Sequence, residues 1–475
     1  MIYPNEVTYI PRKGGQKKIF APQTTIIENK KEDNTKAPIN FPRIAIAEKI
    51  NETTKVPDKV VPEIETIIKK SVTPPINQGV KKDNIKVQNK KINISTESVD
   101  NIIKKVRRNG IMKKAIQFGI VGLGQGGCRI AGEFEKLGYK TLAINTSEQD
   151  LGETPCKEKL LIGTGGAGRN LKTGAEAVNT HRAEIMTAYQ TTFPNIQHAL
   201  VCSGSSGGTG GGGLTSIIDT LKDYKIPVGV ITTLPLNTED TRSKKNTLSV
   251  LNELVKLNAE KKISPLIIID NDKIEKKHPG LSTLEFWNMA NEEVVKCFDV
   301  FNMLAFRTSA YTSFDPADYK RVLVSGGCMI FGTFTVTNEI QVDTLANAIA
   351  SNINSGLLAE GFNLVEATTA ACLIVGNPEK LQKLPRVAEE NAFAMLMKLL
   401  GSGTIFKGVY PLQATPDFEL FFMISGLGLP TSRVKSLIEH TKVEKEHLEK
   451  KATLRTVDDI MKELQTETET NGNGS

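Results

Sequence analysis

Glycine, serine and threonine make up residues 203–213, which read Ser-Gly-Ser-Ser-Gly-Gly-Thr followed by four glycines. A predicted strand, residues 199–202, precedes this run, and a predicted helix, residues 214–221, follows it. Glycines between a buried strand and a helix let backbone N–H groups approach a ligand closely, and the N-terminus of a helix favours an anion. The run therefore predicts an anion-binding loop and argues against a flexible linker.

A second glycine-rich turn occupies residues 122–127, Gly-Leu-Gly-Gln-Gly-Gly, after a predicted strand. Gly122, Gly124 and Gly127 satisfy the dinucleotide pattern G-x-G-x-x-G. An NAD site also needs an acid at the end of the next strand, where this chain has Asn145. Taken alone, the turn is compatible with an NAD-dependent oxidoreductase, with another phosphate site, or with a simple tight turn.

A third stretch, residues 163–170, nearly matches a P-loop because Gly163 and Gly168 have the right separation. Arg169 takes the place of the lysine, and Asn170 replaces the Ser or Thr that would hold magnesium. We therefore reject a Walker-type site. A flexible loop that approaches phosphates remains compatible with the sequence.

Short β-branched runs that alternate with amphipathic stretches must position these three loops. The predicted strands are residues 115–121, 141–144, 160–162, 199–202, 228–232 and 266–269. This alternation predicts an α/β fold with a largely parallel sheet and helices on both faces. The glycine-rich stretches follow the carboxyl ends of the strands, where phosphate sites lie in such sheets.

A long helix, residues 281–306, leads into a second, smaller α+β domain. There we expect strands at 322–336, 370–375, 404–412 and 418–424, helices at 342–358 and 385–400, and a charged helix over about 431–464. The predicted domains are therefore an arm at residues 1–112, a nucleotide-binding domain at 113–306, a second domain at 307–428 and a C-terminal helix with a polar tail at 429–475.

The N-terminal arm differs from the rest of the chain in charge. Residues 1–114 contain 24 Lys and Arg against 12 Asp and Glu, a net charge of +12 that leaves −5 for the remainder, since the whole chain carries +7. Frequent prolines and paired lysines predict disorder, apart from a helix that Ser98 would cap at residues 98–108. We expect the globular part to fold without this arm. The arm is equally compatible with DNA binding, an adaptor-docking role and a solvated tether.

The 475-residue chain is 39% apolar and 24% charged, as is usual for globular proteins. Its longest apolar stretch, residues 323–336, is too short and too interrupted to span a bilayer, and the first residues lack the apolar core of a signal peptide. We therefore expect a cytoplasmic protein without membrane contact. The six cysteines form neither a CxxC pair nor a Cys/His cluster, so we expect structural thiols and no metal held by side chains.

The run that begins at Ser206 resembles the signature loop of the tubulin/FtsZ superfamily, which is centred on Gly-Gly-Thr-Gly. The superfamily's other nucleotide loops lie before and after this run in the right order, and the resemblance extends over about residues 114–428. The resemblance implies that GTP or GDP contacts the following residues of these loops: Gly124, Gln125, Gly126, Gly127, Asn145, Gly165, Gly166, Ala167, Gly168, Ser206, Gly207, Gly208, Thr209, Gly210, Gly211, Glu239 and Asn271. Asn271 would read guanine and Glu239 would contact the sugar.

Two residues of the long helix fit the same base pocket. Trp287 and Asn291 are four residues apart and so share one helical face. In the tubulin/FtsZ superfamily an aromatic ring stacks on guanine, and an Asn or Asp one turn later forms a hydrogen bond with the base. A tryptophan in an ordinary hydrophobic core is the alternative.

In this superfamily the catalytic residues come from a loop of the neighbouring subunit, patterned Asn-x-Asp-x-x-Asp/Glu. The matching residues here are Ser313, Asp315 and Asp318, with serine in place of the leading asparagine, and whether this change slows hydrolysis stays open from the sequence. Two carboxylates can orient water against a γ-phosphate. Alternatively, Asp315 and Asp318 only cap the next helix. The arginine that FtsZ-like chains carry one turn after the acidic residue is absent, and Arg242 or Lys244 would have to replace it.

The resemblance implies a GTP-hydrolysing protein that forms head-to-tail filaments, with GTP between subunits and Mg²⁺ as its companion. The C-terminal residues, 465–475, lack the short apolar peptide of FtsZ, which favours plasmid- or phage-type tubulins that position DNA or particles over a cell-division role. A filament without turnover is an alternative that Ser313 suggests. An NAD-dependent oxidoreductase is another, but it leaves residues 203–213 unexplained.

Overall fold

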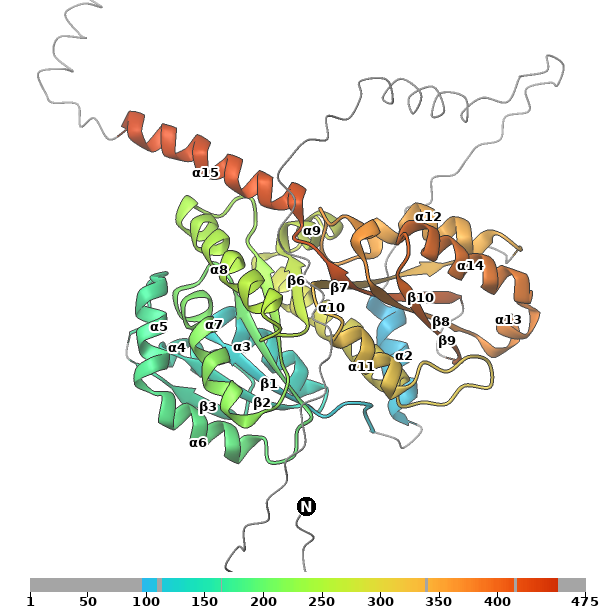
Figure 1. Cartoon of the computed structure of the whole chain (residues 1–475), viewed down its shortest axis with the longest axis horizontal. Coiled ribbons are helices and arrows are strands. Elements are labelled where there is room, and N and C mark those ends of the chain that lie inside the picture. Colours follow the sequence, from blue (N-terminus) through green and yellow to red (C-terminus); the bar gives the residue numbers. More distant parts are fainter. Residues whose placement is uncertain (1–95, 109–112, 164, 338–340, 414–416, 452–475) are drawn as a thin grey trace, which may run out of the picture. The chain divides into compact units, whose positions relative to one another are not determined.

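Ten strands form one sheet in the order β3-β2-β1-β4-β5-β6-β7-β10-β8-β9 (Figure 1). The computed structural model describes residues 96–108, 113–163, 165–337, 341–413 and 417–451. The strands are β1 (Phe118–Leu123), β2 (Lys140–Asn145), β3 (Glu158–Leu161), β4 (His198–Gly204), β5 (Val228–Leu234), β6 (Leu266–Asp270), β7 (Cys328–Val336), β8 (Thr369–Gly376), β9 (Thr404–Pro411) and β10 (Phe418–Leu427). The expected fold class, a mostly parallel α/β sheet with a long helix, is confirmed.

Strands β3, β2, β1, β4, β5, β6 and β7 run parallel, whereas β10 lies antiparallel to both β7 and β8. The two halves of the sheet meet at β6 and β7, which share only the register pairs Leu266↔Cys328 and Ile267↔Met329. This narrow join lies between the predicted nucleotide-binding and second domains. The exact division of the chain into domains stays a prediction.

Helices cover both faces of the sheet. They are α2 (Thr96–Arg108), α3 (Gly124–Lys136), α4 (Glu148–Glu153), α5 (Leu171–Thr180), α6 (Arg182–Thr192), α7 (Gly208–Leu221), α8 (Thr241–Ala259), α9 (Asn271–Lys277), α10 (Thr283–Leu304), α11 (Pro316–Leu323), α12 (Thr344–Gly356), α13 (Pro378–Lys383), α14 (Arg386–Leu399) and α15 (Thr431–Lys451), with 3₁₀ turns at Lys222–Tyr224 and Leu364–Glu366. Side chains alternate along each strand, so Ile120 packs with α3 and α10 on one face, while Val121 packs with α7 and α8 on the other.

Two predicted boundaries are wrong. The strand expected at 322–336 begins only at Cys328, because Asp315 caps α11, Pro316 starts it, and the helix continues to Leu323. The helix expected at 214–221 begins earlier, at Gly208, so most of the glycine run is helical. The 165–170 loop, α5, α8 and the ends of β1 and β4 pack tightly around these glycines, and this tertiary contact overrides their poor intrinsic helix propensity.

Helix α2 lies within the range predicted as a disordered arm, and it packs on α10 (Figure 1). Val99, Ile102, Ile103 and Val106 are all buried there. The helix begins at Thr96, two residues before the expected Ser98. Residues 1–95, which carry the other expectations about the arm, and residues 452–475, with the end of the expected C-terminal helix and the polar tail, lie outside the described residues.

Candidate functional site

A cleft of about 580 Å³ lies at the carboxyl ends of β1, β4, β5 and β6. It brings together most of the residues predicted to bind a nucleotide, although they come from loops far apart in the sequence. Those that line it are Gly124, Gln125, Gly126, Asn145, Gly165, Gly166, Ala167, Gly168, Ser206, Gly207, Gly208, Thr209, Gly210, Glu239, Asn271, Trp287 and Asn291. The remaining two predicted residues are Gly127 and Gly211, and they lie behind this wall.

Gly127 and Gly211 allow close backbone packing. A Cβ atom on Gly127 would lie 2.0 Å from the carbonyl oxygen of Cys202, and one on Gly211 would lie 2.6 Å from that of Ser205. Both distances are impossible for a real side chain. These glycines therefore let α3 and α7 approach β4 and the loop after it, and so they shape the cleft without lining it.

The N-termini of α3 and α7 converge on the cleft. Gly124, Gln125 and Gly126 begin α3, while Gly208 and Thr209 begin α7. Within the described part of the chain, no side chain caps the first turn of either helix, and neither first turn contains an acid. Their free N–H groups and partial positive charge make this end of the cleft suited to an anion such as a polyphosphate.

Hydrogen bonds between side chains hold the loops that follow β1, β2 and β4 in place. Asp150, on α4, accepts bonds from Gln125 Nε2 at 3.0 Å and from Asn145 Nδ2 at 3.3 Å. The hydroxyl groups of Thr146 and Thr209 lie 2.7 Å apart. The cleft is therefore already organised by contacts within the protein.

The loop at 165–170 forms one side of the same end. Gly165, Gly166, Gly168 and Arg169 all have positive φ angles, which explains its glycine content. The Arg169 side chain pairs with Asp240, and Asn246 Nδ2 donates to the Arg169 carbonyl at 2.9 Å and to the Ser206 carbonyl at 3.0 Å. This loop is thus joined to α8 and to the glycine run.

The opposite end of the cleft contains the residues expected to bind a base. Asn271 is the first residue of α9, and Trp287 and Asn291 lie on α10, whose N-terminus is fixed by a capping box between Ser282 and Glu285. Trp287 is partly exposed and so is available to a ligand. An aromatic face beside a side-chain amide is suited to a flat heteroaromatic base.

A buried group of charged side chains holds α9 and α10 together at this end of the cleft. Glu293 of α10, which is almost fully buried, accepts from Lys277 Nζ at 2.6 Å and contacts His278 Nε2 at 3.3 Å. The His278 and Lys277 partners offset the effect of burial and hold the pKa of Glu293 below its usual value. This contact fixes the end of α9 against α10, and so it fixes Asn271 relative to Trp287.

Several lining residues are not predicted from the sequence: Leu123, Arg129, Ile130, Thr146, Ser147, Asp150, Arg169, Gly204, Thr233 and Leu236. Arg129 carries the clearest missed signal, because it lies one helical turn after Gln125 and so faces the same way. Among the described residues that line the cleft, the arginines are Arg129 and Arg169. Arg242 is exposed and Lys244 buried on α8, and both lie outside this lining.

Asp315 and Asp318 lie at the other edge of the sheet. Asp315 caps α11, with its Oδ1 accepting from the Asp318 backbone N–H at 2.9 Å. The adjoining turn of α11, Pro316 to Lys320, borders a hollow with Ile116, Gln197 and Pro227, which lie at the amino ends of β1, β4 and β5. The two carboxylates are therefore remote from the cleft of their own chain.

The surroundings of Asp318 and Ser313 are set by their own chain. Partial burial, and then the neighbouring Asp315 carboxylate, raise the pKa of Asp318. Ser313, which stands where the family has asparagine, accepts a hydrogen bond from the Ser309 N–H at 2.9 Å. The capping interpretation of Asp315 thus describes its contacts within one chain, and a catalytic role would have to come from contact with another.

Few of the described side chains could bind a metal ion or react as a thiol. The described residues contain no group of three or more His, Cys, Asp or Glu placed to hold a metal ion. All six cysteines are free and buried, and burial raises the pKa of Cys156, for example. No helix in the described ranges is long and apolar enough to cross a membrane.

Comparison with known proteins gives one consistent relationship. Residues 117–278 match the model of the Tubulin/FtsZ family, GTPase domain. The chain is 24% identical over 369 residues to the tubulin-like protein TubZ of Bacillus cereus, covering 70% of this chain and 84% of that protein. It is 27% identical over 346 residues to the tubulin-like protein CetZ of Pyrococcus furiosus, covering 70% and 91%.

Solved structures agree on the fold. A GTPγS-form protofilament of TubZ from Bacillus thuringiensis serovar israelensis matches with a TM-score of 0.64 at 18% identity, over 74% of this chain and 98% of that one. A GTPγS-bound protofilament of CetZ2 from Haloferax volcanii matches with a TM-score of 0.60 at 21% identity, over 70% and 100%. Together with the family match, these findings confirm that the chain resembles the tubulin/FtsZ superfamily, with residues 117–278 matching its GTPase domain.

Proposed function

We propose that this protein binds GTP in the cleft, hydrolyses it, and assembles head to tail into filaments. The observation that carries the proposal is the convergence of two uncapped helix N-termini at one end of the cleft, with Asn271 and Trp287 at the other. The first end suits a triphosphate and the second a purine base. The relatives named above include a TubZ protofilament in a GTPγS form, which supports the choice of nucleotide.

Hydrolysis would need a second copy of the chain. The cleft lies at the carboxyl edge of the parallel strands, and Asp315 and Asp318 lie at the amino edge. A head-to-tail contact would bring the amino edge of one copy over the cleft of the next. The two carboxylates could then orient a water molecule toward the γ-phosphate.

We further propose that Mg²⁺ accompanies the nucleotide. Mg²⁺ in nucleotide sites is commonly held by phosphate oxygens and water, with one or two carboxylates. The cleft contains two carboxylates, Asp150 and Glu239, although Asp150 already bonds Gln125 and Asn145. This donor set fits an ion held mainly by the triphosphate, and the ion would neutralise charge on the phosphates.

The cellular role that fits best is the positioning or segregation of DNA or particles. One of the solved relatives is described as the TubZ of type III plasmid segregation, and another is a two-stranded TubZ filament. A DNA or adaptor partner would contact the basic residues 1–112. A filament without turnover is the second candidate, favoured by Ser313 in place of asparagine.

Calorimetry and assembly assays test the proposal. Titration of the full chain with GTP, ATP and NAD should show a clear preference for GTP, and equal affinities would exclude a guanine site. Light scattering and phosphate release are then followed together after GTP is added. Both should rise, whereas scattering without phosphate release would favour the filament without turnover.

A further inference from the structure

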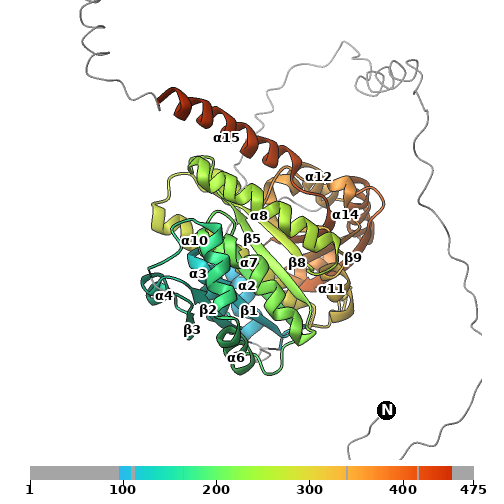
Figure 2. The ribbon, with the colours of Figure 1, turned by 60° about the vertical axis from the view of Figure 1, so that its left-hand side comes forward.

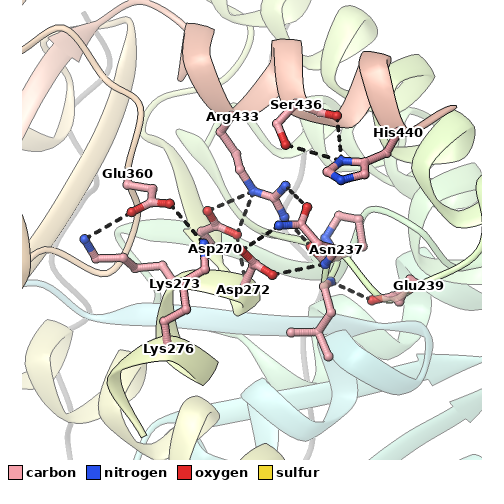
Figure 3. A network of polar contacts seen from close by, with 12 residues as sticks. Asn237, Glu239, Asp270, Asp272, Lys273, Lys276, Glu360, Arg433, Ser436 and His440 are labelled. Atoms are coloured by element: carbon pink, nitrogen blue, oxygen red, sulfur yellow. Dashed lines mark hydrogen bonds and ion pairs between the residues drawn. The ribbon is translucent and has the colours of Figure 1, made fainter. Parts of the chain in front are cut away.

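A buried arginine joins the C-terminal helix to the base end of the cleft (Figure 3). Arg433, in the first turn of α15, is only 4% exposed. Its Nε donates to Asp270 Oδ1 at 3.1 Å and to Oδ2 at 3.0 Å. Its Nη1 donates to Asn237 Oδ1, and its Nη2 to the Pro235 carbonyl, both at 2.6 Å. One guanidinium group therefore contacts two separate loops.

Both loops shape the base end of the cleft. Asp270 immediately precedes Asn271 and caps α9, accepting from the Asp272 N–H at 3.2 Å. Asn237 lies between Leu236 and Glu239, which both line the cleft. Asn237 also donates to Asp272 from its side chain at 2.8 Å and from its backbone at 3.1 Å. Arg433 thus completes a closed network that sets the position of Asn271 relative to Glu239.

The same side chain also anchors α15. This helix packs against α8, and Leu437, one turn after Arg433, is fully buried there (Figures 1 and 2). After Leu437, residues 438–440 of α15 expose their side chains, such as those of Glu439 and His440. The docking of α15 and the geometry of the base end therefore depend on one shared set of hydrogen bonds.

We infer that Arg433 is a positioning residue for the nucleotide, and that it links the docking of α15 to recognition of the guanine base. The inference rests on the proposed function. If Arg433 holds Asn271 and Glu239 in the binding arrangement, then nucleotide binding must in turn stabilise the docked α15 by the same factor, because coupling between two sites is reciprocal. A purely structural ion pair would stabilise the fold without this link.

Substitution with lysine separates the two roles. Arg433→Lys keeps a positive charge beside Asp270 but loses the fork that contacts Asn237 and Pro235. We expect affinity for GTP to fall about tenfold. Affinity for ATP, which gains little from Asn271, should change less than twofold, so the ratio of GTP to ATP affinity should fall about tenfold. Calorimetry measures both affinities, and a retained ratio would overturn the inference.

Two controls address general destabilisation. Arg182→Lys changes an exposed arginine contact, to Asp223 and the Asp219 carbonyl, away from the cleft. Leu396→Ala opens a cavity in the core beneath α14 and lowers the melting temperature. Both should leave the ratio of GTP to ATP affinity unchanged. If the Leu396→Ala variant also lost its preference for GTP over ATP, the effect of Arg433→Lys would reflect lost stability and the inference would fail.

Hydrogen exchange on the unmodified chain provides a second test that does not depend on a variant folding. The protein is kept below the concentration at which filaments form, GDP is added, and exchange of the backbone amides of residues 434–440 is measured. We expect about tenfold slower exchange with GDP, and no change would refute the coupling. If the unmodified chain shows no preference for GTP over ATP, the proposed function itself fails; if it shows that preference but the link to α15 is absent, only this inference fails.

Discussion

The two edges of the same parallel strands are built by different means. At the carboxyl edge, Gly208 and its neighbours present backbone groups, and their lack of side chains is what allows loops to meet there. At the amino edge, Asp315, Asp318 and His198 present side chains at the ends of regular elements. A site made of backbone requires glycine at fixed places and therefore stands out in a sequence. A site made of side chains can equally be a cap or a core residue.

Helix α10 connects these two edges. Trp287 and Asn291 lie near its N-terminus at the cleft. Near its C-terminus, Asn302 Oδ1 accepts from the Ile116 N–H at 2.9 Å and its Nδ2 donates to the Ile116 carbonyl at 3.0 Å, just before β1. The relative position of the edges therefore depends on what holds α10, and α2 packs along it.

Removal of α2 should have the largest effect on both edges. Deletion of residues 1–111 exposes the surface under four buried apolar side chains of α2, each worth about 1.5–3 kcal/mol, so the free energy of unfolding should fall by several kcal/mol. It also removes the Asp100–Lys296 and Arg107–Asp299 ion pairs. Deletion of residues 1–95 is the control and should leave stability nearly unchanged. Urea denaturation measures both, and equal stabilities would mean that α2 contributes nothing.

Asp318→Ala should abolish turnover while leaving the cleft intact. A group that orients or activates water contributes about 10²–10⁴-fold, so kcat for phosphate release should fall at least about 100-fold. Affinity for GTP should stay within about twofold, since Asp318 is remote from the cleft of its own chain. Glu379→Ala removes a comparable acid from the first turn of α13 and should retain activity. Unchanged turnover in Asp318→Ala would rule out this carboxylate.

Gly208→Ala should weaken the other edge. Its Cβ would lie 2.8 Å from the Ala167 Cβ and 2.8 Å from the Asn170 N. Overpacking of this kind costs about 1–3 kcal/mol, so we expect GTP affinity to fall about tenfold or more as residues 165–170 are displaced. Gly152→Ala is the matched control, because nothing lies within 4 Å of its Cβ. Calorimetry would contradict the prediction if both variants bound GTP equally.

A mixture of these two variants tests whether the edges cooperate between copies. An Asp318→Ala subunit has an intact cleft, and a Gly208→Ala subunit has intact carboxylates. In randomly mixed filaments about a quarter of the contacts would pair an intact cleft with intact carboxylates. At a GTP concentration that leaves most Gly208→Ala clefts empty, phosphate release by the mixture should then exceed that of either variant alone. If the mixture shows only the average of the two activities, the carboxylates do not act across an interface.

The sequence predicted that the glycine-rich loops meet at the carboxyl edge, because their sequence signal is local. Each glycine-rich loop follows a strand, and parallel strands bring their carboxyl ends together. The sequence did not show that α7 begins at Gly208 or that Gly127 packs on Cys202, because both depend on contacts with distant strands. The contact between Arg433 and Asp270 is even harder to predict from the sequence, because the two residues are 163 positions apart. Long-range contacts between single charged residues leave no periodic signal.

His198 gives the smallest effect and tests whether the amino edge is independent of the cleft. The pKa of His198 is lowered to about 4, mainly by burial; the hydrogen bond from Nε2 to the Ser264 carbonyl acts in the opposite direction, and the charge of Lys320 adds a smaller lowering effect. In the unfolded chain the imidazole titrates near 6.5. Between these two values the unfolded chain binds more protons, so stability is complete above about pH 6.5 and is lost as the pH falls toward 4.

Between pH 7 and pH 5.5 this single group should lower the free energy of unfolding by about 1 kcal/mol. Urea denaturation of the unmodified chain and of His198→Gln at both pH values isolates its part, because other titrating groups, such as Asp270 with its pKa raised to about 6 by burial, contribute equally to both proteins. Glutamine can still donate to the Ser264 carbonyl. If the edges are independent, GTP affinity at pH 7 should be the same in both proteins. Equal pH dependence of stability would mean that His198 does not stay neutral in the folded chain, and a loss of GTP affinity would mean that the amino edge reaches the cleft through the strands themselves.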